Sequence, residues 1–124
     1  MTIRHTALIT VLFVLFCLVS VLGLPAALGA HPWWAAKSGV IGSLLGAAFV
    51  FGWWLMVKET RFLPWIALVS LGSSTLAAVL GKQVFVASFA ENAVAGRFWF
   101  FGWFGLSASL FVLIVALLLS RLER

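Results

Sequence analysis

The chain is short and very apolar: of its 124 residues, 65% are hydrophobic and 9% are charged. A soluble domain carries about 25% charged residues, so this composition excludes an ordinary water-soluble protein. The net charge of +5 comes from basic residues scattered along the sequence, which we expect to face lipid headgroups rather than nucleic acid.

Four stretches without any ionisable residue other than Cys17 divide the chain almost evenly. They cover residues 6–30, 38–57, 62–81 and 98–120. A helix needs about 20 apolar residues to cross a hydrocarbon core of about 30 Å. The sequence therefore predicts a single domain over residues 1–124, an all-α integral membrane bundle of four transmembrane helices.

The first stretch has an alternative interpretation as a secretory signal peptide. Arg4 precedes an apolar run, and small residues follow it near Gly23. The run is longer than a signal core usually is, which favours a first transmembrane helix. Cys17 lies within this helix, and as the single cysteine it cannot form an intrachain disulfide. We expect it to be a packing residue.

The later connections are predicted to differ in character. Residues 58–61 form a tight turn, which makes an antiparallel hairpin of the second and third spans. Residues 83–96 carry Glu91 as their single charge and are otherwise largely apolar. We expect this segment to lie in the interface as a short helix between the third and fourth spans, or to extend the third span past Lys82. Glu91 is expected to pair with Arg97 as a structural tether.

Basic residues and tryptophans predict the orientation and the membrane boundaries. With the N-terminus inside, five basic residues lie in the cytoplasm and three outside, a positive-inside bias. We therefore expect an integral protein of the bacterial inner (plasma) membrane with both termini in the cytoplasm. Tryptophans at the span ends are expected to be interfacial anchors. They are Trp33, Trp34 and Trp99 at one interface and Trp53, Trp54 and Trp65 at the other.

Small residues recur at helical spacing inside three of the spans. In lipid, helices associate where small residues let two backbones approach closely. We expect these residues to pack the four helices together, and as an alternative to offer a surface for self-association or for a partner's helix. The predicted helix–helix interface residues are Gly39, Gly42, Ser43, Gly46, Ser70, Ser74, Ala78, Gly102, Gly105 and Ser109.

Bulky side chains dominate the half of the spans nearest the termini, with Phe13, Phe16 and Phe111 among them. One interpretation is an aromatic-lined cleft that admits a lipid tail, a quinone or a pigment. The other is that these rings pack against one another or face lipid.

No catalytic, metal or cofactor motif is found, so we expect neither an enzyme nor a cofactor. Coupled transporters place a titratable acid or base within a span, and these four spans contain no Asp, Glu, His, Lys or Arg. The favoured function is an accessory or assembly subunit that docks on a larger membrane complex through its small-residue faces. The alternative is an oligomeric channel or transporter for a small or lipid-like solute. Expected partners are membrane lipid and another membrane protein or a second copy.

Overall fold

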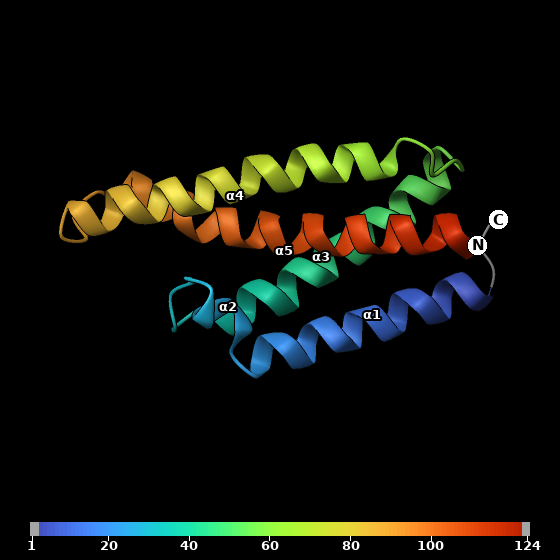
Figure 1. The fold of residues 1–124 in the computed structure, drawn as a ribbon, viewed down its shortest axis with the longest axis horizontal. Coiled ribbons are helices and arrows are strands. Elements are labelled where there is room, and N and C mark those ends of the chain that lie inside the picture. The colour runs from blue at the N-terminus through green and yellow to red at the C-terminus, as the bar shows by residue number, and fades with distance from the viewer. Residues whose placement is uncertain (1–2, 123–124) are drawn as a thin grey trace.

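The computed structural model describes residues 3–122, and within them all regular secondary structure is helical (Figure 1). The helices are α1 (Ile3–Val21), α2 (Leu24–Ala27), α3 (Ala35–Met56), α4 (Leu63–Ala87) and α5 (Ala93–Leu122). All except the short α2 are long and apolar enough to cross a membrane. The predicted class, an all-α bundle of four transmembrane helices, is confirmed.

Helix α5 forms the centre of the bundle. α4 runs along one side of α5, α3 crosses its other side at an angle, and α1 packs on α3 (Figure 1). Within the described residues, the backbone of α4 comes close to that of α5 and to no other helix. One face of α4 is therefore left without a helix of this chain against it.

The bundle has two distinct ends. The start of α1, the end of α5 and the turn 57–62 lie together at one of them, which we call the terminal end (Figure 1). The loop 22–34, which contains α2, and the turn 88–92 lie at the other, which we call the aromatic end (Figure 1). The two ends of the described chain therefore face the same side of a membrane crossed by the four long helices.

The first helix ends at Val21, well before the predicted boundary at residue 30. Gly23 and Gly29 have positive φ angles of 103° and 118°, which glycine adopts without a side-chain clash. Pro25 lies in the first turn of α2, where its missing N–H group is tolerated. Backbone conformation, rather than the next charged residue, therefore ends the first span.

The third span is longer than predicted, because α4 continues past Lys82 to Ala87. Phe89 and Ala90 then have positive φ angles of 57° and 65°, a left-handed conformation that stops a helix. Of the two expectations for residues 83–96, the extension of the third span is the one observed. No separate interfacial helix forms between α4 and α5 in the described chain.

Local hydrogen bonds hold the turn 88–92 together. The Asn92 side-chain oxygen accepts a hydrogen bond of 3.0 Å from the Ala95 N–H and so caps the start of α5. The Ser88 hydroxyl accepts one of 2.9 Å from the Asn92 N–H. No ion pair joins Glu91 to Arg97 in this part of the structure, so the expected tether is wrong.

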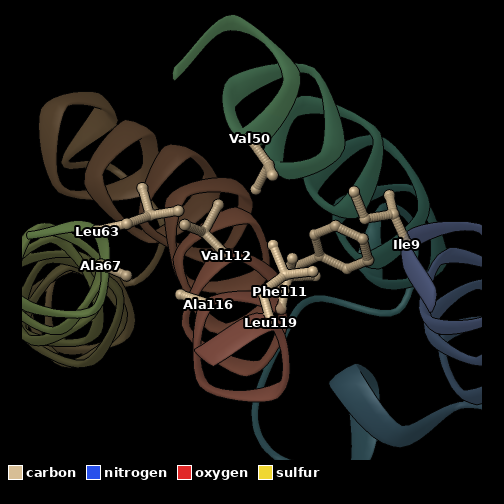
Figure 2. Packing of buried hydrophobic residues seen from close by; sticks show 9 residues of the cluster. Ile9, Val50, Leu63, Ala67, Phe111, Val112, Ala116 and Leu119 are labelled. Atoms are coloured by element: carbon tan, nitrogen blue, oxygen red, sulfur yellow. The ribbon is translucent and has the colours of Figure 1, made fainter. Parts of the chain in front are cut away.

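A buried apolar cluster joins all four long helices toward the terminal end (Figure 2). Phe111 of α5 lies at its centre, and the Phe16 ring of α1 meets the Phe111 ring edge-on, with centroids 5.2 Å apart. Packed side chains thus fill much of the half of the bundle where the sequence suggested an aromatic-lined cleft, and Phe16 also lines a cleft between α1 and α5. The buried members are Ile9, Val50, Leu63, Ala67, Phe111, Val112, Val115, Ala116 and Leu119.

Candidate functional site

The small residues of α3 lie against α5 and α1. A Cβ on Gly42 would lie 2.6 Å from a side-chain carbon of α5, and one on Gly46 would lie 2.8 Å from the Ala108 carbonyl oxygen. Real side chains do not tolerate such distances, so glycine is what permits this approach. Gly39 makes room in the same way for Ser20 of α1.

The small residues of α4 and α5 face each other along the whole contact between these helices. A Cβ on Gly102 would lie 2.5 Å from the Ala78 backbone nitrogen. One on Gly105 would lie 2.5 Å from the Ser74 hydroxyl oxygen. This close approach of two backbones gives α4 and α5 extensive dispersion contact.

The hydroxyl groups of three predicted interface residues, Ser43, Ser70 and Ser109, form hydrogen bonds within the chain. The Ser109 hydroxyl donates a hydrogen bond of 2.9 Å to the Ser70 hydroxyl and so links α5 to α4. The buried Ser43 hydroxyl donates one of 3.0 Å to the Val40 carbonyl of its own helix. In lipid, a hydroxyl bonded in this way carries no unpaired polar group into the hydrocarbon.

The predicted interface residues therefore lie mainly at contacts between helices of the same chain. A partner that used Gly42, Gly46 or Gly102 would have to displace α5 or α4. If the protein docks on another helix, it does so through other residues.

The outward face of α4 offers such residues. Trp65, Val69 and Leu76 are 67%, 71% and 62% exposed. Gly72 lies between them, and a Cβ there would meet nothing within 4 Å. We call these four residues the α4 seam. Sequence analysis missed the seam, although its spacing of four, three and four residues could have shown that they share one face of a helix.

The tryptophans lie toward the two ends of the bundle, but their surroundings differ. Trp33 and Trp65 are strongly exposed and can reach lipid headgroups. Trp99, predicted as an anchor, is 7% exposed and donates a hydrogen bond of 3.1 Å from Nε1 to the Gly29 carbonyl. Its ring also contacts the ring of His31, with centroids 5.6 Å apart. Trp99 therefore holds the loop 22–34 onto α5.

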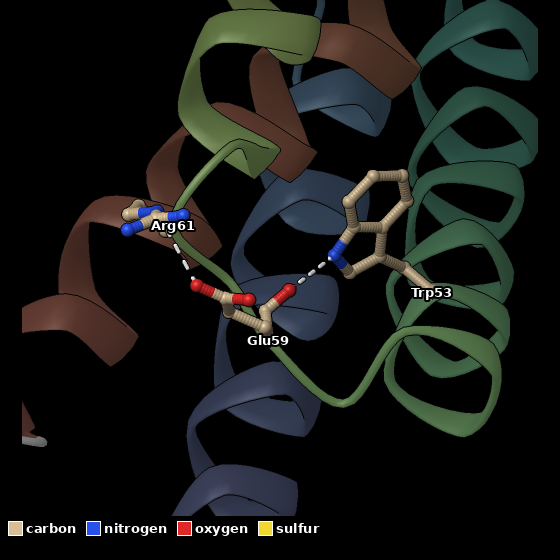
Figure 3. A network of polar contacts seen from close by, with 3 residues as sticks. All are labelled: Trp53, Glu59 and Arg61. Atoms are coloured by element: carbon tan, nitrogen blue, oxygen red, sulfur yellow. Dashed lines mark hydrogen bonds and ion pairs between the residues drawn. The ribbon is translucent and has the colours of Figure 1, made fainter.

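The predicted tight turn at the terminal end forms as expected. The Trp53 indole N–H donates a hydrogen bond of 2.6 Å to the Glu59 carbonyl oxygen (Figure 3). The Arg61 Nε lies 3.3 Å from the Glu59 Oε1 (Figure 3). Both side chains of the ion pair are mostly exposed, so the pair contributes little to stability.

A cleft opens near the aromatic end between the loop 22–34, α4 and α5. Its volume is about 760 Å³, and its lining is mostly apolar, with Leu28, Val79, Val86 and Trp103 among its walls. Lys82 is the one basic residue of the lining. Its Nζ lies 5.7 Å from the centre of the Trp99 ring.

A second cleft of about 330 Å³ continues from the first between α1 and α5. The two share Leu28, Trp103 and Leu106, and the second extends along α5 to Ile114. We call the two adjoining clefts the apolar groove; its lining extends from Lys82 toward the middle of the bundle.

These surfaces are suited to binding. The described residues contain no cluster of three or more His, Cys, Asp or Glu side chains that would hold a metal ion. What the chain presents is helix surface, a tryptophan-rich end and an apolar groove with one cation. Comparison with protein-family models, with curated proteins and with solved structures finds no match.

Proposed function

We propose that the protein is a non-catalytic subunit that docks on a transmembrane helix of a larger membrane complex through the α4 seam. The observation that carries this proposal is the absence of any helix of the described chain from the outward face of α4. Helices α1 and α3 contact each other as well as α5, whereas the only long helix that α4 contacts in the described chain is α5.

The spacing of the α4 seam supports a helix as the occupant. The steps of four, three and four residues average about 3.7, close to the 3.6 residues of one helical turn, so the four residues follow one face of α4 that a neighbouring helix could cover. Trp65, Val69 and Leu76 provide bulky side chains on either side of Gly72. A neighbouring helix would place its own side chains between them.

The presence of glycine at position 72 supports the same conclusion, because glycine lowers the stability of a helix. Glycine in a helix is destabilising by about 0.5–1 kcal/mol relative to alanine. The glycines at the contacts between helices recover this cost through close packing, but Gly72, like Gly52 of α3, faces open space. A partner backbone that approaches at Gly72 would recover it there.

The short connections between the helices also favour a function that depends on contacts made by the helices. The connections 57–62 and 88–92 are short, and neither forms a soluble domain. A chain built in this way acts mainly through its helix faces and the lipid around them.

The test is a comparison of two glycine variants in native membranes. Gly72→Leu adds a side chain to the seam, whereas Gly52→Leu adds the same side chain to α3 at a position that is equally open. Both variants should fold, because nothing lies within 4 Å of either position. After extraction in mild detergent, the Gly72→Leu chain should lose its large complex on a native gel, and the Gly52→Leu chain should keep it.

The composition of that complex separates the two kinds of partner. A second polypeptide in the complex identifies another membrane protein, and a complex made of this chain alone identifies self-association. Equal complex yields for Gly72→Leu and Gly52→Leu would contradict docking through the α4 seam.

A second candidate function is an oligomeric channel or transporter for a small or lipid-like solute. The groove beside Lys82 favours a lipid-like solute, because it is open and almost wholly apolar. Purified protein in vesicles tests this candidate through the transfer of a fluorescent phospholipid between leaflets. A transporter should accelerate transfer above that of empty vesicles, and a docking subunit should leave it unchanged.

A further inference from the structure

Of the lysines and arginines that the structure describes, Lys82 is the one whose side chain is not exposed. It lies inside α4 rather than in a connection, and its side chain is half-buried. Among the described residues it forms no ion pair, and its ammonium group makes a cation–π contact with the Trp99 ring. A cation–π contact of this kind leaves the positive charge without an anion.

The surroundings of the ammonium group leave little room on one side. A Cβ on Gly29 would lie 3.2 Å from the Lys82 Nζ, so the loop backbone at Gly29 lies close beside the ammonium group. Trp99 holds that same backbone in place through its hydrogen bond to the Gly29 carbonyl. The loop 22–34 and the ring of Trp99 thus fix Lys82 at the mouth of the first cleft.

The groove that starts at Lys82 has the length of one acyl chain. Its α5 wall runs from Trp103 to Ile114, which at 1.5 Å per residue is about 16 Å. Half of a hydrocarbon core of about 30 Å is nearly the same length. The walls along this distance are Leu28, Leu106, Leu110 and other apolar side chains.

We propose that an anionic phospholipid binds here, with its phosphate on the Lys82 ammonium group and an acyl chain in the groove along α5. The charge complementarity and the matched length point to this one occupant. The tryptophans of the aromatic end place Lys82 at the depth of the headgroups, where a phosphodiester lies. This site is separate from the α4 seam, so it does not depend on the docking partner.

The test uses the purified full chain in detergent and measures bound lipid by native mass spectrometry. The ligands are dioleoyl phosphatidylglycerol, which is anionic, dioleoyl phosphatidylcholine, which has no net charge, and glycerol 3-phosphate, which lacks acyl chains. The unsubstituted protein should bind the anionic lipid about tenfold more tightly than the zwitterionic one, because the choline ammonium of the latter offsets the phosphate charge and repels Lys82. Excess glycerol 3-phosphate should not displace it.

Two lysine variants give the control. Lys82→Met keeps the length and the apolar stem but removes the charge, and it should abolish the preference for the anionic lipid. Lys37→Met removes an exposed lysine at the same end and should preserve the preference. Lys82→Arg restores a cation and should restore the preference. Circular dichroism checks that each variant keeps its helix content.

Three results would overturn the proposal. Equal binding of the two phospholipids by the unsubstituted protein would exclude a charge-selective site. An unchanged preference in Lys82→Met, or an equal loss in Lys37→Met, would reduce Lys82 to one of several headgroup anchors. Displacement by glycerol 3-phosphate would indicate a phosphate site that makes no use of the groove.

Discussion

Individual glycines of this chain differ in what a side chain would meet. Gly102 lies against the backbone of α4 at Ala78, whereas Gly72, on the outward face of α4, meets nothing. The same residue type therefore has opposite effects on stability at the two positions. At Gly102, the close approach of α5 to α4 requires glycine. At Gly72, no contact within the described chain requires it.

This contrast gives the first prediction. Gly102→Ala should lower the free energy of unfolding by about 1–3 kcal/mol, because the added methyl group overpacks the contact between α4 and α5. Gly72→Ala should raise it by about 0.5–1 kcal/mol, through better helix propensity. The measurement is unfolding in mixed micelles with increasing dodecyl sulfate, followed by circular dichroism. Similar changes in both variants would mean that α4 and α5 do not pack as described.

The candidate site was partly predictable at the residue scale. The small residues at helical spacing identify the face of a helix that another helix can approach closely. The ten predicted interface residues lie mainly at contacts within the chain. Spacing shows which residues share a face, but it does not show which helix covers that face. For this reason the sequence left open whether Gly42 and Gly46 serve the bundle or a partner. The α4 seam was missed because its members are mostly large.

At the scale of elements, the turn between α4 and α5 carries unfavourable backbone conformations. Phe89 and Ala90 both have positive φ angles, and neither is glycine. A left-handed conformation costs a residue with a side chain about 1–2 kcal/mol. Hydrogen bonds between the backbone and the Ser88 and Asn92 side chains hold the turn in this shape.

The second prediction follows from this turn. Ala90→Gly should raise the free energy of unfolding by about 0.5–1 kcal/mol, because glycine adopts the required φ angle without a clash. Ala87→Gly, in the last turn of α4, is the control and should lower it by a similar amount. The same titration in mixed micelles measures both. A loss of stability in Ala90→Gly would show that the turn has another conformation.

Element boundaries were harder to predict than element identity. Four apolar stretches identified the four long helices, because a membrane requires such lengths of any chain that crosses it. The helix ends depend instead on backbone conformation at Gly23, Phe89 and Ala90. Charged residues mark the depth of the headgroups, and a helix can continue past them, as α4 does at Lys82. The predicted end at residue 30 was wrong for this reason, whereas the continuation of the third span past Lys82 was one of the two expectations for residues 83–96.

At the scale of the whole molecule, the orientation is the third prediction. With the terminal end in the cytoplasm, a cysteine at Thr60 in a Cys17→Ser background should be shielded from an impermeant thiol reagent in intact cells. A cysteine at the exposed Ala93, at the aromatic end, should react. Both should react after the membrane is opened. The reverse pattern in intact cells would place the terminal end outside.

Docking through the α4 seam is tested most directly by crosslinking inside the native membrane. A photoreactive side chain is introduced at Val69 in the seam, or at Leu45 on α3, which is also exposed to lipid. Docking predicts one protein adduct of discrete mass from Val69, lost when Gly72→Leu is added, and none from Leu45. Adducts to lipid alone at Val69, or the same protein adducts from both positions, would contradict it.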